Sequence, residues 1–85
     1  MNQVFQDHWN AGPALRRRPR LSRREIECLD WASQGKSSSA IGTILSVSPR
    51  TVDSYLASAC GRLHVRTRIE AVAIAVALGL INPGR

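Results

Sequence analysis

The sequence of 85 residues has few groups that could bind a metal or enter a membrane. Its only cysteines, Cys28 and Cys60, lack the paired spacing of a zinc site and the CxxC pattern of a redox motif. The longest apolar run, residues 71–78, is far too short to span a bilayer. No basic region followed by an apolar run marks a signal peptide at the N-terminus. We therefore expect two buried, reduced thiols in a cytoplasmic protein with no metal, cofactor or membrane association.

Catalytic groups and strand patterns are also missing. No set of His, Cys, Ser and carboxylate side chains converges at catalytic spacing, and His8 and His64 lie in an N-terminal segment and at an expected helix end. No segment alternates polar and apolar residues as a strand does. The sequence therefore predicts one all-α domain that is not an enzyme.

Lysine is nearly absent, yet the chain is strongly basic. Lys36 is its single lysine, and arginines bring the net charge to +6 and the pI to about 11.1. Such a charge favours a polyanionic partner, with nucleic acid ahead of an anionic membrane surface.

Half of the excess positive charge lies in residues 1–20, which we interpret as an N-terminal arm and basic linker before a domain over residues 21–85. Val4, Phe5 and Trp9 leave two interpretations open, a short helix that docks on the domain and a frayed terminus. The basic cluster could follow a phosphate backbone or enter a minor groove. Its members are Arg16, Arg17, Arg18 and Arg20.

Capping signals predict four helices after residue 20. They are expected over about residues 23–34, 38–45 and 49–63, with a fourth that ends at Gly79, and their caps are Ser22, Ser37 or Ser38, Ser48 and Thr67. Glu25 and Glu70 stand where they complete capping boxes, and Pro49 favours the start of the third helix. Gly35 supplies the left-handed stop of the first helix.

The second and third helices are joined by a tight turn over residues 46–48. This is the sequence form of a helix-turn-helix, whose second helix lies in the major groove, although many helical bundles share the spacing. The second helix is expected to turn Ile41, Ile44 and Leu45 inward. The core face of the third helix is expected to consist of Val52, Leu56, Ala59 and Leu63.

The opposite face of the third helix is small and polar, which suits close approach to another macromolecule. It carries Arg50, Ser54, Ala57, Ser58 and Gly61, with Asp53 and Tyr55 at its flanks. Arg50 and Thr51, in the first turn, are placed to meet phosphate, and Lys36 is similarly available; the alternative for each is an exposed group without a partner.

Asp53 is the discordant residue of this surface. Phosphate repels a carboxylate unless the carboxylate accepts a hydrogen bond from a cytosine amino group or pairs with an arginine. Its place near a helix N-terminus offers a simpler interpretation, in which the helix dipole stabilises it.

A set of positions over residues 21–81 follows one family pattern: Leu21, Arg24-Glu25, Glu27, Leu29, Ala32, Gly35-Lys36-Ser37, Ile41, Leu45, Val47-Ser48, Thr51-Val52, Leu63, Val65-Arg66-Thr67, Glu70-Ala71-Val72 and Gly79-Leu80-Ile81. With these positions the segment closely resembles the C-terminal DNA-binding domain of LuxR-type regulators, the GerE-like helix-turn-helix family, and among these the quorum-sensing regulators most.

The resemblance implies a four-helix domain that binds duplex DNA through the third helix and forms a homodimer through the fourth. By matching position, base contacts fall to Asp53, Ser54 and Ala57, and we add Ser58 from the same face. Phosphate contacts fall to Lys36, Arg50, Thr51 and Tyr55. The fourth helix is apolar all round, so we expect Ala73, Ile74 and Ala77 in the dimer interface, the alternative being burial under the N-terminal arm.

Several positions depart from the family pattern. Asp53 replaces a basic or amide residue, Ala57 cannot form a hydrogen bond, and Ala40 replaces the glutamate that would complete the cap of Ser37. Gly61 falls inside the third helix, and His64 replaces its glycine stop.

Only 20 residues precede Leu21, too few for a sensor domain, so no small-molecule ligand is expected and the chain is either a minimal regulator or a fragment. We expect a transcriptional regulator, with RNA polymerase or a full-length LuxR-type regulator as further partners. The alternative is an interaction protein, an antiactivator that binds and blocks a full-length relative.

Overall fold

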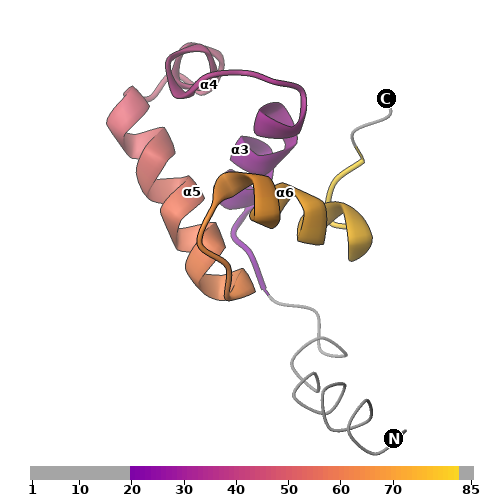
Figure 1. Ribbon diagram of the computed structural model, residues 1–85. Coiled ribbons are helices and arrows are strands. Elements are labelled where there is room, and N and C mark those ends of the chain that lie inside the picture. Colours follow the sequence, from indigo (N-terminus) through magenta and orange to yellow (C-terminus); the bar gives the residue numbers. More distant parts are fainter. Residues whose placement is uncertain (1–19, 83–85) are drawn as a thin grey trace, which may run out of the picture.

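The computed structural model describes residues 20–82, which form four α-helices and no strand. The helices are α3 (Arg23–Ser33), α4 (Ser38–Leu45), α5 (Pro49–Leu63) and α6 (Arg68–Ala77). The all-α prediction is confirmed. In Figure 1, α4 crosses one end of the domain, α5 runs along one side, and α6 lies across α3. The expectations for the arm, including Arg16, Arg17 and Arg18, concern residues outside this described range.

Each helix begins at a hydroxyl side chain, as the sequence predicts. The caps are Ser22, Ser37, Ser48 and Thr67, and each accepts a hydrogen bond from the backbone N–H three residues later. Glu25 and Glu70 complete capping boxes in α3 and α6. In α4 that position is Ala40, whose side chain cannot return the bond, so Ser37 caps this helix alone.

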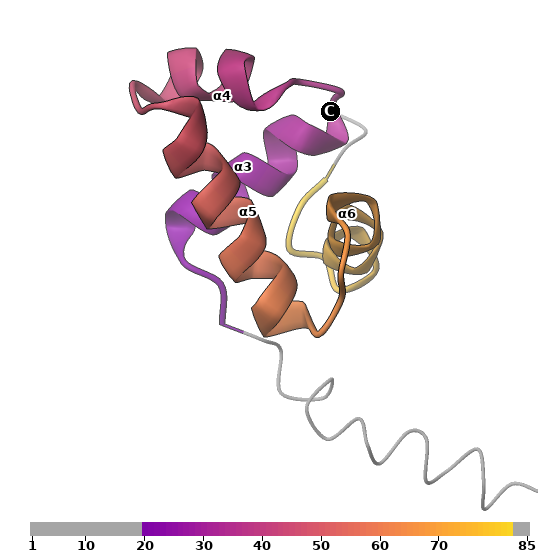
Figure 2. The same ribbon diagram turned by 60° about the vertical axis from the view of Figure 1, so that its left-hand side comes forward.

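The core lies between α3 and α5, each of which packs against the other three helices (Figure 2). The expected core face of α5 is confirmed, since Val52, Leu56, Ala59 and Leu63 are all buried. Leu29 of α3, Ile41 of α4 and Ala71 of α6 are fully buried against them.

The expectation for Ile44 is wrong. Its side chain is 43% exposed, whereas Ile41 is fully buried and Leu45 is partly buried against the core. The short helix α4 packs against α5 and α3, and a narrow apolar face is enough to fix it there. Ile44 lies beside that face and remains at the surface.

Left-handed residues end the helices or form the turns after them. Gly35 and Gly79 have φ values of 83° and 74°, and α6 itself ends at Ala77, two residues before the expected Gly79. His64 has a φ of 60° after α5, and Ser46 has a φ of 61° in the turn between α4 and α5. Both carry a Cβ in a conformation that favours glycine.

Candidate nucleic-acid interface

The turn between α4 and α5 passes very close to α4. The Val47 backbone N–H donates to the Gly42 carbonyl at 2.9 Å. A Cβ added to Gly42 would lie 2.6 Å from the Val47 carbonyl oxygen, a distance that real Cβ atoms do not adopt. Glycine at this position therefore allows the tight turn that sets the angle between the two helices.

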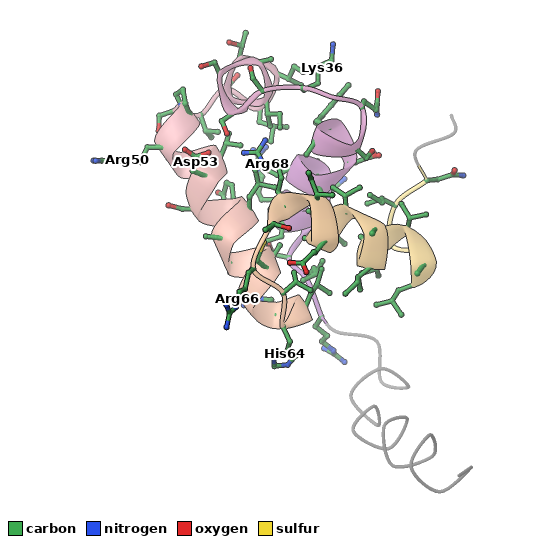
Figure 3. The ribbon with its side chains drawn as sticks, viewed as in Figure 1. Lys36, Arg50, Asp53, His64, Arg66 and Arg68 are labelled. Carbon is green, nitrogen blue, oxygen red and sulfur yellow. The ribbon has the colours of Figure 1, made fainter. Side chains whose placement is uncertain are left out.

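The first turn of α5 presents a cation and two hydroxyl groups. Ser48 caps the helix, and its hydroxyl lies 2.9 Å from that of Thr51. Arg50 is exposed and points away from the domain, and Lys36 extends outward just before α4 (Figure 3). The structure thus places both cations beside the N-terminal ends of α4 and α5, where helix dipoles also favour anions.

Ion pairing distinguishes these cations from most of the others. Arg23 and Arg24 pair with Glu27, Arg62 pairs with Glu25, and Arg68 pairs with Asp53. Within residues 20–82, the cations that form no ion pair are Arg20, Lys36, Arg50 and Arg66. Arg66 lies near the C-terminal end of α5 (Figure 3). The sequence did not indicate it as a binding residue, because its distinguishing feature, the lack of an ion pair, appears only in the structure.

The outer face of α5, which we define as Asp53, Ser54, Ala57 and Ser58, is exposed along its length. Ala57 and Ser54 are small, so another molecule can approach the helix backbone closely there. Tyr55, at the flank, is half-buried and packs against the core. The outer face of α5 is therefore small, polar and exposed, as the sequence predicts, and Tyr55 is more buried than its neighbours.

Asp53 belongs to a polar cluster that the sequence did not indicate, which we call the Asp53 cluster (Asp53, Ser38 and Arg68). The Ser38 hydroxyl donates to Asp53 Oδ1, and Arg68 Nη2 lies 3.7 Å from the same oxygen. Arg68 Nη2 also donates to Ser38 Oγ at 3.0 Å. Figure 3 shows Arg68 and Asp53 lying next to each other. The discordant carboxylate is thus paired with an arginine from another helix.

Ser58 belongs to a second network, centred on Glu25. The Glu25 side chain is 4% exposed and accepts hydrogen bonds from the Ser58 hydroxyl, from the Ser22 backbone N–H at 2.7 Å and from Arg62 Nε at 3.3 Å. Burial opposes ionisation, but these bonds and the Arg62 charge outweigh it, so the pKa of Glu25 is lowered. The hydroxyl proton of Ser58 is therefore committed within the protein.

The outward side of α6 is a second exposed surface, and it is apolar. Ile69 is 79% exposed and Val76 is 39% exposed, with the exposed Ala73 between them at helical spacing. We call these three residues the α6 stripe. Of the residues expected in a dimer interface, Ala73 and Ala77 are exposed, whereas Ile74 is half-buried against the core. Figure 2 shows α6 nearly end-on at the edge of the domain.

The two cysteines lie on different helices, Cys28 on α3 and Cys60 on α5. Cys28 is fully buried as expected, whereas Cys60 is only partly buried, and burial raises the pKa of both free thiols. Among residues 20–82 no group of three or more His, Cys, Asp or Glu side chains could hold a metal ion. None of the helices described is long and apolar enough to cross a membrane.

Comparison with known proteins supports the interpretation of this geometry. Residues 19–75 match the family model for bacterial regulatory proteins of the luxR family. The solved structure of the transcription factor GerE superimposes with a TM-score of 0.71, at 25% sequence identity, over 74% of this chain and 94% of that one. This chain therefore shares its fold with a transcription factor.

Curated relatives agree with this result. The transcriptional activator VanR of Vibrio anguillarum is 43% identical over 83 residues, which are 98% of this chain and 33% of VanR. The quorum sensing-dependent regulator RpaR of Rhodopseudomonas palustris is 48% identical over 66 residues, 78% of this chain and 27% of RpaR. The chain thus spans between about a quarter and a third of the length of these relatives. It belongs to the luxR family of bacterial regulatory proteins.

Proposed function

We propose that this domain binds duplex DNA, with α5 in the major groove, and regulates transcription. The observation that carries the proposal is the exposed, small-residue outer face of α5, bordered by the unpaired cations Arg50 and Lys36 beside the N-terminal ends of α5 and α4. A helix enters the major groove most closely where its side chains are short, and flanking cations neutralise phosphates. The names of VanR and RpaR, a transcriptional activator and a transcriptional regulator, support the same function here.

In this proposal two groups of residues in the helix-turn-helix have separate roles, one at phosphates and one at base edges. Lys36, Arg50 and Thr51 bind phosphates and fix the position of α5, with Tyr55 as a further candidate. Asp53, Ser54 and Ala57 face base edges. Ser58 contributes less than its neighbours to base contacts, because its proton is donated to Glu25.

The test is a salt titration of binding to genomic duplex fragments. Each phosphate contact adds about 0.9 to the slope of log affinity against log salt, so Arg50→Ala should lower the slope by about 1 and weaken binding to all fragments. Ser54→Ala should instead reduce the preference among fragments. Arg23→Ala is the matched control, since it removes an arginine whose side chain is 92% exposed on α3, paired with Glu27.

Two results would contradict the proposal. One is equal loss in Arg50→Ala and Arg23→Ala, which would mean that only net charge matters. The other is binding of every fragment no tighter than about micromolar at moderate salt, which is the range of nonspecific affinity. The second result would favour the interaction-protein alternative.

We further propose that two copies associate through the α6 stripe. Ile69, Ala73 and Val76 form an apolar surface on a helix whose other side is already buried against α3 and α5. Exposed apolar surface of this kind is commonly covered by a partner. A symmetric pair would present two α5 helices to one DNA duplex, as dimeric helix-turn-helix proteins do.

Sedimentation equilibrium tests this association. Val76→Glu should shift the protein toward monomer, because it buries a charge in the expected interface. Ile44→Glu is the matched control, since Ile44 has similar exposure, 43% against 39%, on a different helix. Equal behaviour of the two variants, or a monomeric parent protein both with and without DNA, would contradict the proposal.

A further inference from the structure

The Asp53 cluster fixes the carboxylate on the outer face of α5 from two sides. Ser38 is the first residue of α4 and Arg68 is the first residue of α6. Both contact Asp53 Oδ1, and the 3.0 Å bond between Arg68 Nη2 and Ser38 Oγ closes the triangle. The orientation of the Asp53 side chain is therefore set by two neighbouring helices rather than by α5 alone.

The second oxygen of the carboxylate is left for another partner. Both contacts go to Oδ1, and no group in the described part of the chain bonds to Oδ2. The Asp53 side chain is 63% exposed. Asp53 therefore presents one oriented acceptor beside Ser54 on the surface that the proposed function places against DNA.

We propose that Asp53 is a specificity-determining residue that accepts a hydrogen bond from the N4 amino group of a cytosine in the major groove. Ser38 and Arg68 act as positioning residues for it. This inference rests on the proposed DNA-binding function and names what one position of its binding site recognises.

The chemistry of the major groove selects cytosine. An ionised carboxylate is an acceptor only. Guanine presents the acceptors N7 and O6, and thymine presents the acceptor O4, so these two bases repel the carboxylate. The adenine amino group lies between two acceptors, its own N7 and O4 of the paired thymine, whereas the cytosine amino group has an acceptor on one side only, O6 of the paired guanine. Cytosine is thus the base that an aspartate favours.

Arg68 makes a carboxylate tolerable at this place. Phosphates on both sides of the groove repel an unpaired negative charge, and the guanidinium of Arg68 supplies a positive charge within 4 Å of it. Ser38 and Arg68 also restrict the Asp53 rotamer before DNA arrives, so less freedom is lost on binding.

Selection of binding sites from a library of random duplexes tests the inference. The parent protein should enrich sites with a cytosine at one position of the half-site, and replacing that cytosine by thymine should weaken binding by about tenfold. Asp53→Ala should make this position degenerate and leave the others unchanged. Asp53→Asn should move the preference toward adenine, whose N6 and N7 match a carboxamide.

Variants of the positioning residues separate orientation from folding. Arg68→Gln and Ser38→Ala should reduce the cytosine preference several-fold at the same position only, which a general loss of structure would not do. Arg23→Gln is the matched control for charge, because, like Arg68→Gln, it removes one positive charge from an arginine that pairs with a carboxylate, and it should leave every position as in the parent. Thermal unfolding confirms that each variant is folded.

The possible failures are distinguishable. If the parent enriches a site whose cytosine persists in both Asp53 variants, the inference is overturned and DNA binding stands. If the cytosine preference depends on Asp53 but is unchanged in Arg68→Gln and Ser38→Ala, the positioning role is overturned. If the parent enriches no sequence and binds no duplex, the proposed function fails and the inference falls with it.

Discussion

Two glycines of the helix-turn-helix have opposite surroundings. A Cβ on Gly42 would meet the Val47 carbonyl oxygen at 2.6 Å, whereas a Cβ on Gly61 would have no heavy atom within 4 Å. Gly42 is thus required by the close approach of the turn. Gly61 lies in the helix α5 without such a contact and only adds backbone freedom to the unfolded chain.

Alanine at these positions should therefore have effects of opposite sign. We expect Gly42→Ala to lower the free energy of unfolding by about 1–3 kcal/mol, because the turn must move to admit the methyl group. Gly61→Ala should raise it by up to about 1 kcal/mol, the difference in helix propensity. Urea unfolding at constant pH measures both, and a neutral Gly42→Ala would show that the turn shifts freely.

Glu25 links the cap of α3 to α5 and makes stability depend on pH. Its folded pKa lies below the ordinary value of 4.5, because hydrogen bonds from Ser58 and Ser22 and the charge of Arg62 outweigh the cost of burial. A lowered folded pKa means that the carboxylate stabilises the fold above about pH 4.5. That contribution is lost as the pH falls through the folded pKa.

Glu25→Gln should lower the free energy of unfolding at pH 7 by about 2 kcal/mol, since Ser58 and Arg62 lose a charged acceptor. The difference from the parent should shrink as the pH falls below 4.5, which urea unfolding at several pH values measures. Glu27→Gln removes a more exposed carboxylate and should change stability at pH 7 by no more than about 0.5 kcal/mol. A constant difference between Glu25→Gln and the parent at all pH values would show that ionisation of Glu25 does not stabilise the fold.

Sequence patterns predicted the hydrogen bonds between residues close in sequence, but not the bonds that the same side chains form with other helices. Glu25 was expected to close a capping box with Ser22, three residues away, and it does. Its bonds to Ser58 and Arg62 cross 33 and 37 residues of sequence and depend on how α3 packs on α5. The pairing of Asp53 with Arg68 depends likewise on where α6 begins. The sequence therefore indicated that Asp53 could pair with an arginine, but not which arginine it would be.

Among the helices, α5 ends in an unfavourable conformation. Its C-cap His64 has a φ of 60°, and its backbone N–H donates to the Gly61 carbonyl at 3.3 Å. A residue with a Cβ is strained there relative to glycine. His64, which replaces the glycine of the family pattern, thus adopts the left-handed conformation that glycine would adopt there.

His64→Gly should stabilise the domain by about 1 kcal/mol, because the left-handed position no longer carries a Cβ. His64→Ala is the control, since it removes the imidazole but keeps the Cβ, and it should show no such gain. The midpoint of thermal unfolding reports both. A gain of equal size in the two variants would assign the effect to the imidazole rather than to the backbone.

Helix boundaries were predictable because their causes are local. Hydroxyl caps, two capping boxes and Pro49 gave the starts of all four helices, and α5 covers residues 49–63 as expected. The exposure of Ile44 was not predictable from α4 alone. Periodicity placed it inward, but only the position of α4 on α5 and α3 decides how wide a face is covered.

The whole domain presents two surfaces of different chemistry. The outer face of α5 is small and polar and lies near the unpaired cations Arg50 and Lys36, whereas the α6 stripe is apolar. The two surfaces lie on different helices, so binding of DNA and association of two copies need not compete. Family resemblance indicated both surfaces from the sequence, but the exposure of Ile69 and the partial burial of Ile74 required the packed structure.

An NMR titration of the full chain with its tightest-binding duplex tests whether α5 contacts DNA through its outer face. We expect the largest changes in backbone amide signals at Arg50, Ser54 and Ala57, with further changes next to Lys36. Smaller changes in α6 would accompany dimer formation on the duplex. If binding leaves the α5 amides unmoved and perturbs another surface instead, the outer face of α5 is not the DNA-binding site.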